Sequence, residues 1–124
     1  MLAQLFAKLT GRSTRWPAVR RVYLAANPKC AGCGAAKSLS VHHVEPFHLK
    51  PELELEPSNL ITLCEPWFGG QKCHLRIGHN NNWRDVNPHV RVDALTHLRL
   101  VEKMRRCEFC GAIKKAPAPT KGAG

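Results

Sequence analysis

The apolar residues of this chain come in short runs separated by Pro, Gly and Asn, a pattern typical of a small domain with mixed α and β elements. The central runs are short and rich in Val, Ile and Leu, which favours strands, whereas the outer runs have helical spacing. The predicted elements are a helix over residues 14–26, strands over 38–44 and 59–64, a helix over 72–77 and a helix over 89–104. The centre is therefore predicted to be a ββα unit, with an extended proline-rich connection between its strands.

The flanking segments divide the chain further. Helical spacing on the last helix predicts a core face made of Val92, Leu95, Leu98 and Val101 or Met104. The tail after residue 111 is rich in Lys, Pro, Ala and Gly, and we expect it to be disordered. The expected units are a basic N-terminal segment over 1–29, a core over 30–83, a C-terminal helix over 84–106 and a basic tail over 107–124.

Composition narrows the class of protein. The chain has 124 residues with 19 Lys and Arg against 9 Asp and Glu, a net charge of +10, and residues 1–29 contain no acid. Such a surplus is typical of nucleic-acid binding. No apolar run is long enough to span a membrane, and the opening MLAQLFAKL lacks the features of a secretory signal. We therefore expect a cytoplasmic protein without a membrane partner. A core this small usually needs stabilisation by a metal, disulfides or a partner.

The chain has six cysteines, and in a reducing compartment clustered cysteines bind metal more often than they form disulfides. Cys30 and Cys33 form a Cys-x-x-Cys turn, while Cys64 closes the second strand and Cys73 opens the following helix. We predict that these four hold a structural Zn²⁺ ion; the alternative is a set of buried thiols without a ligand. The third pair, Cys107 and Cys110, has no obvious partners and receives no role.

Polar residues lie at the junctions of the ββα unit in the order His42-His43, Asn59, His74. Together with the stretches CAGCG, VHHVEP, SNLITLC and CHLRIGH, they make residues 30–83 resemble the HNH endonuclease family, including a subgroup common in phage and bacterial genomes. The resemblance implies an α+β fold, with a small ββα-metal (His-Me finger) core, a four-cysteine zinc frame and flanking N- and C-terminal helices. It implies that His43 is the general base, that His42 and His74 bind a catalytic divalent ion, and that Asn59 fixes the loop.

Phosphodiester hydrolysis is consistent with these residue types. A neutral imidazole can accept a proton from water near neutral pH, and a divalent ion such as Mg²⁺, Mn²⁺, Zn²⁺ or Ni²⁺ can act as a Lewis acid. His42 and His43 are neighbours on a strand, so their side chains point to opposite faces. In-line attack places the water and the leaving group on opposite sides of phosphorus, so a base and a metal ligand that diverge can serve one phosphate. His79 is a candidate third metal ligand, although five residues on an α-helix separate it from His74 by about 140°; otherwise it is a surface or substrate-contacting residue.

Basic side chains near this centre are candidates for phosphate contacts, and they are Arg20, Arg21, Lys72 and Arg76. The three Trp residues could stack on bases, but core packing is the expected role. The leading hypothesis is a metal-dependent endonuclease of low sequence specificity acting on DNA, with RNA as an alternative substrate. The other hypotheses are a non-catalytic zinc module that binds nucleic acid and an accessory protein of a phage packaging or host nuclease assembly.

Overall fold

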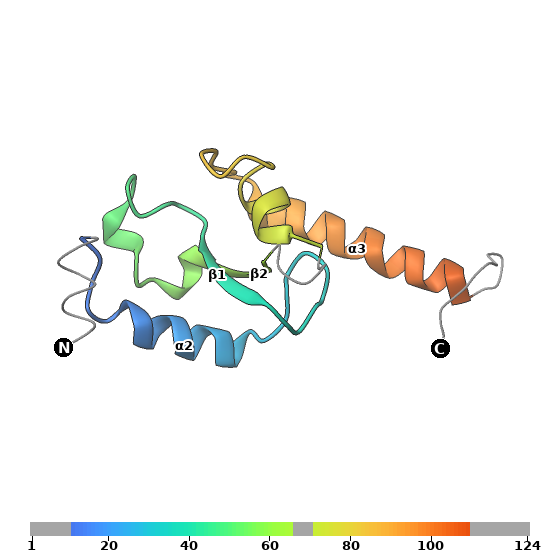
Figure 1. Cartoon of the computed structure of the whole chain (residues 1–124), viewed down its shortest axis with the longest axis horizontal. Helices are drawn as coiled ribbons and strands as arrows, with labels where there is room; N and C mark the ends of the chain where they lie inside the picture. Colours follow the sequence, from blue (N-terminus) through green and yellow to red (C-terminus); the bar gives the residue numbers. More distant parts are fainter. Residues whose placement is uncertain (1–10, 66–70, 110–124) are drawn as a thin grey trace.

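A computed structural model describes residues 11–65 and 71–109 of the chain. The expected disordered tail, the side chains of the third cysteine pair and Trp67 lie outside the described residues. Within them, the main elements are α2 (Trp16–Ala26), β1 (Leu39–His43), β2 (Leu60–Cys64), a π-helix (His74–Gly78) and α3 (Val90–Phe109). The two strands and the π-helix form the predicted ββα unit, and the α+β class with flanking helices is confirmed (Figure 1). None of the described helices has both the length and the apolar character needed to cross a lipid bilayer.

The two strands pair in antiparallel fashion, and their register decides which side chains share a face. His42 lies opposite Ile61, and His43 lies opposite Leu60. Because side chains alternate along a strand, His42 and Ile61 face the π-helix, whereas His43 and Leu60 face α2. The predicted divergence of the two histidines is therefore present in the fold.

Each face of the strand pair is covered by its own hydrophobic cluster. On one face Trp16 of α2 packs with Val41 and Leu60. On the other face Leu63 and the four central cysteines pack beneath the π-helix and the start of α3. An isolated two-stranded sheet is barely stable in water, so these two clusters hold the unit together.

The prediction for the core face of α3 was right only in part, since Leu98 is half-buried and Val101 packs against the buried cluster. Val92, Leu95 and Met104 are 66%, 46% and 64% exposed, whereas Val90 and Ala94 are almost completely buried. The small side chain of Ala94 lets the helix approach the cysteine cluster closely, and the C-terminal half of α3 extends beyond the other elements (Figure 1). Three members of the predicted apolar stripe therefore point to solvent, and the buried face of the helix lies beside it.

The connection between the strands also differs from the extended segment that we expected. It contains two short 3₁₀ turns, Pro51–Leu53 and Pro57–Asn59, each of which begins with proline. Proline fixes φ near −65°, which favours the start of a helical turn. The compact connection folds back beside β1 and brings Glu54 and Asn59 into the interior.

Candidate functional site

The four cysteines predicted to form a zinc frame are buried, and their sulfur atoms lie within 4.8 Å of one another. They are Cys30, Cys33, Cys64 and Cys73. The Sγ atoms of Cys33 and Cys64 are 3.8 Å apart, close to the separation of about 3.8 Å that tetrahedral zinc with 2.3 Å bonds requires. The predicted grouping is confirmed, and the cluster is close enough to hold a zinc ion.

The ionisation of these thiols also fits a bound dication. The pKa of Cys30 is lowered to about 5, chiefly by a hydrogen bond from the Cys73 thiol and also by main-chain amides, including that of Gly32. The pKa of Cys33 is raised to about 11 by burial, and that of Cys73 is raised by its hydrogen bond to Cys30 and by burial. Cys33 and Cys73 therefore resist ionisation in this cluster, and a Zn²⁺ ion would supply the positive charge that stabilises their thiolates.

A second cluster consists of three histidines, one from β1, one from the start of the π-helix and one directly after its end. One ring nitrogen from each of His42, His74 and His79 lies within 4.8 Å of the other two, and the ring centroids are 4.9–5.1 Å apart. The Nε2 atom of His42 is buried and has no hydrogen-bond partner among the described residues. Burial, followed by the neighbouring histidines, lowers the pKa of His42 to about 3. A buried neutral imidazole with an unpartnered nitrogen is the form that binds a divalent ion.

The π-helix explains how His79 joins this cluster. In an α-helix a spacing of five residues would turn His79 about 140° away from His74. The π-helix ends at Gly78, and its wider turn is followed directly by His79, whose main-chain N–H donates to the oxygen of Leu75 at 3.2 Å. The sequence identified His79 as a candidate ligand, but it contained no signal for this wider turn.

Hydrogen bonds fix the orientation of two of these rings. The Nδ1 atom of His74 lies 3.2 Å from a carboxylate oxygen of Glu65, and the Nδ1 atom of His79 lies 2.9 Å from the main-chain oxygen of Asp85. Each acceptor favours the tautomer with the proton on Nδ1, which leaves Nε2 free to bind a metal. Sequence reasoning missed Glu65, although its position directly after Cys64 was a usable signal.

His43, the last residue of β1, lies on the opposite face from His42. Its ring packs on Trp16 at a centroid distance of 4.5 Å, and its Nε2 atom lies 2.9 Å from the main-chain oxygen of Glu54. When Nε2–H donates this hydrogen bond, Nδ1 carries a free lone pair that can accept a proton. Burial lowers the pKa of His43, and the hydrogen bond to Glu54 opposes this effect only partly.

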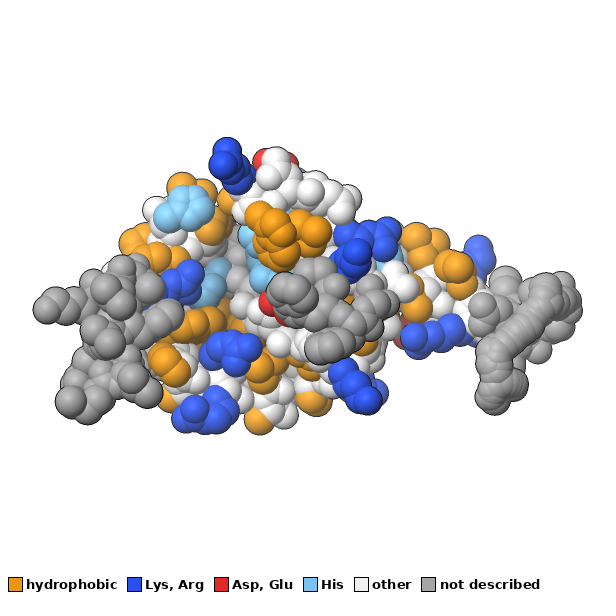
Figure 2. Space-filling view, in the orientation of Figure 1, with side chains coloured by type: hydrophobic (Ala, Val, Ile, Leu, Met, Phe, Trp, Pro, Cys, Tyr) orange, Lys and Arg blue, Asp and Glu red, His pale blue; other side chains and the backbone are white. Residues whose placement is uncertain are grey.

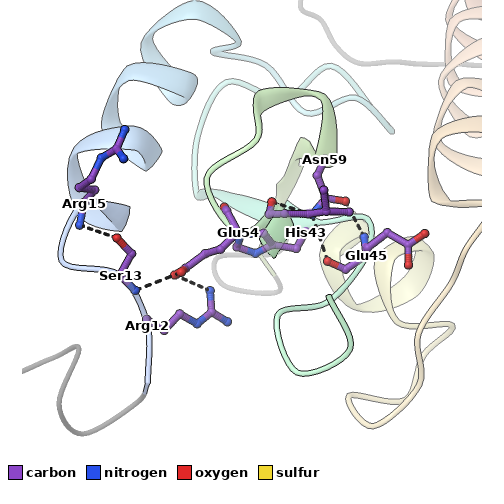
Figure 3. A network of polar contacts seen from close by, with 8 residues as sticks. Arg12, Ser13, Arg15, His43, Glu45, Glu54 and Asn59 are labelled. Atoms are coloured by element: carbon purple, nitrogen blue, oxygen red, sulfur yellow. Dashed lines mark hydrogen bonds and ion pairs between the residues drawn. The ribbon is translucent and has the colours of Figure 1, made fainter. Parts of the chain in front are cut away.

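Asn59 fixes the connection that carries the oxygen partner of His43. Its Oδ1 accepts a hydrogen bond from the main-chain N–H of Glu45 at 2.8 Å. Its Nδ2 donates to the main-chain oxygens of Glu45 and Leu53 at 3.1 and 3.2 Å (Figure 3). Leu53 directly precedes Glu54, so Asn59 acts on His43 through the backbone of the connection and not by direct contact.

The side chain of Glu54 ties the same connection to the N-terminal segment, a contact that the sequence did not predict. Glu54 is 4% exposed, and its Oε1 accepts a hydrogen bond from the main-chain N–H of Ser13 at 3.0 Å. Its Oε2 lies 3.8 Å from the guanidinium of Arg12 (Figure 3). Arg12 also lies over the ring of Phe47, 4.7 Å from its centroid. The side of the site that carries His43 therefore contains an arginine held by a carboxylate and an aromatic ring.

One cleft of about 740 Å³ is lined by His42, His43, His74 and His79, together with His48. Figure 2 shows histidine side chains set back in one face of the molecule, with positively charged and hydrophobic side chains nearby. Arg20, one of the predicted phosphate contacts, lines the cleft together with Arg12 and Arg84, which the sequence analysis did not select. The other three predicted contacts, Arg21, Lys72 and Arg76, are exposed but do not line it.

The tryptophans do not share one role. Trp16 is buried against His43, as expected for core packing. Trp83 is 50% exposed, lines the cleft and places its ring against His74 and His79 at centroid distances of 5.2 and 5.0 Å. The expectation of core packing was therefore wrong for Trp83.

Of three comparisons with known proteins, one found a match, and it covers both clusters of this site. Searches of curated proteins and of solved structures found no match. A family model described as HNH endonuclease matches residues 30–80, a segment that contains the four clustered cysteines, Asn59, His42, His43, His74 and His79. The predicted resemblance to the HNH endonuclease family is therefore confirmed over residues 30–80.

Proposed function

We propose that the protein is a metal-dependent endonuclease that hydrolyses phosphodiester bonds of DNA. One observation carries the proposal: an imidazole with a free Nδ1 and a cluster of three further imidazoles line one cleft from opposite faces of β1. Hydrolysis of a phosphodiester needs a base for the attacking water and charge neutralisation at the phosphoryl and leaving oxygens. The cleft offers residues suited to both tasks.

In this mechanism His42, His74 and His79 hold a divalent ion, which supplies Lewis acidity when bound. His43 accepts the proton of the attacking water at Nδ1, while its Nε2–H remains bonded to Glu54. This hydrogen bond also supports the imidazolium that forms, because the carbonyl dipole points at the ring N–H.

The guanidinium groups of Arg12, Arg20 and Arg84 line the cleft, where they can bind the phosphates on either side of the scissile bond. Contacts of this kind position the backbone without reading the bases, which supports cleavage of low sequence specificity. The net charge of +10 also favours a polyanionic substrate.

The test is nicking of supercoiled plasmid by the full chain with Mg²⁺, Mn²⁺, Ni²⁺ or Zn²⁺. His43→Ala is expected to reduce the rate by about 10²–10⁴-fold, the usual contribution of a general base, and EDTA is expected to stop cleavage. His89→Ala removes an exposed imidazole outside the cleft and serves as the matched control. If DNA is bound but not cut with any of these metals, or if His43→Ala cuts at the normal rate, the proposal fails.

A further inference from the structure

The carboxylate of Glu65 contacts one histidine of the cleft but does not belong to the three-histidine cluster. Its Oε2 atom lies 3.2 Å from Nδ1 of His74, and the side chains of Glu65 and His74 are only 23% and 15% exposed. The backbone of Glu65 is also held, since its N–H donates to the main-chain oxygen of Ser38. The pair is therefore fixed at both the backbone and the side chain.

Chain connectivity explains why these two residues meet. Glu65 directly follows Cys64, and His74 directly follows Cys73. The two cysteines belong to one cluster, and the main-chain N–H of Cys73 donates to the sulfur of Cys64 at 3.4 Å. Bringing the cysteines together therefore brings the carboxylate to the imidazole.

A carboxylate differs from the other acceptor in this site. His79 donates to a neutral main-chain oxygen, whereas His74 faces a charged group. A carboxylate fixes the Nδ1–H tautomer, orients the ring and increases the basicity of Nε2, and loss of such a partner typically weakens metal binding about 10–100-fold.

We propose that Glu65 is a positioning residue, which fixes His74 and strengthens it as a ligand in the His42, His74, His79 site. This inference rests on the proposed metal-binding role of that site, but it concerns metal affinity and is tested apart from cleavage. The carboxylate acts through His74 and does not itself bind the ion.

The experiment is a calorimetric Ni²⁺ titration of the full chain loaded with one zinc per molecule. Glu65→Ala is expected to lower the Ni²⁺ affinity about 10–100-fold. Glu65→Gln, whose amide oxygen can still accept the hydrogen bond, is expected to lose less. Glu56→Gln removes the same charge from an exposed position and is expected to bind Ni²⁺ normally, while His42→Ala identifies the site by removing a ligand.

A second readout separates positioning from general damage. At saturating Ni²⁺ the Glu65→Ala protein is expected to recover most of the maximal cleavage rate, with a higher metal concentration needed for half of it. Zinc content and thermal unfolding should match those of Glu56→Gln. Equal Ni²⁺ affinities for Glu65→Ala and Glu56→Gln would overturn the inference, whereas normal Ni²⁺ binding without cleavage by the unmodified chain would overturn only the proposed function.

Discussion

Gly78 lies against the metal-binding side of the site with no space for a side chain. A Cβ atom added there would lie 3.2 Å from Cε1 of His42, 3.3 Å from its Nδ1 and 3.2 Å from Cδ1 of Leu63. These distances are shorter than ordinary contacts, so the side chains of His42 and Leu63 must give way by a few tenths of an ångström. Gly78→Ala is therefore predicted to move one metal ligand while leaving all three imidazoles present.

The size of the effect follows from packing and from metal geometry. Extra methylene or methyl groups in a packed core typically cost ~1–3 kcal/mol, and metal–nitrogen distances tolerate only about ±0.2 Å. If the metal-bound state carries this cost, the affinity falls roughly 5- to 150-fold, at ~1.4 kcal/mol per factor of ten. Alanine also stabilises a helical position by up to about 1 kcal/mol relative to glycine, so the metal affinity is a better readout than the unfolding temperature.

The assay is Ni²⁺ titration of the zinc-loaded chain, compared with Gly32→Ala. A Cβ at Gly32 would lie 3.0 Å from Sγ of Cys73 and 2.9 Å from Cδ1 of Ile77. That variant is therefore expected to release zinc faster to a chelator, whereas Gly78→Ala is expected to retain zinc and bind Ni²⁺ weakly. Normal Ni²⁺ affinity in Gly78→Ala would refute the argument that His42 is held in a tightly packed position.

Three further predictions concern other parts of the site. Asn59→Ala removes three hydrogen bonds from a residue that is 5% exposed, so urea unfolding should show a loss of about 2–4 kcal/mol; a loss below about 1 kcal/mol would contradict this. Cys73→Ser should abolish the cooperative unfolding transition, because structural zinc contributes on the order of 10 kcal/mol. Burial lowers the pKa of His43, so its NMR titration should have a midpoint below the usual value of about 6.5. The unfolded chain takes up this proton at higher pH than the folded chain does. The free energy of unfolding should therefore decrease as pH falls from about 6.5 to the pKa of His43 in the folded protein.

The sequence was sufficient to predict the ββα unit and the members of both clusters. Strand patterns are local, and Cys-x-x-Cys spacing restricts the positions of two sulfurs on one turn. The cysteines at the end of β2 and before the π-helix then had to meet the first pair if they were to share an ion. The opposite orientations of His42 and His43 were also predictable, because side chains alternate between the two faces of a strand.

The missed features depend on contacts between distant segments. Ser13 and Glu54 are 41 residues apart in the chain, and no local pattern indicates that Arg12 enters the cleft beside them. The buried face of α3 was also beyond local analysis, because helical periodicity gives relative positions only. Which stripe is buried depends on the neighbouring surface, here the cysteine cluster that accepts the small side chain of Ala94.

The two roles proposed for His42 and His43 of β1 depend on different parts of the fold. The face of His42 packs against the π-helix, whose first residue directly follows the cluster member Cys73, so the cysteine cluster supports the metal-binding side. The face of His43 packs against Trp16, and its oxygen partner lies on a connection held by Asn59 and by the N-terminal segment. A strand pair has little stability of its own. Its two histidines are therefore held in place by two separate sets of neighbouring residues. We therefore expect that mutations can remove the proposed base without removing the proposed metal site, and the reverse, because two separate hydrophobic clusters cover the two faces of the strand pair.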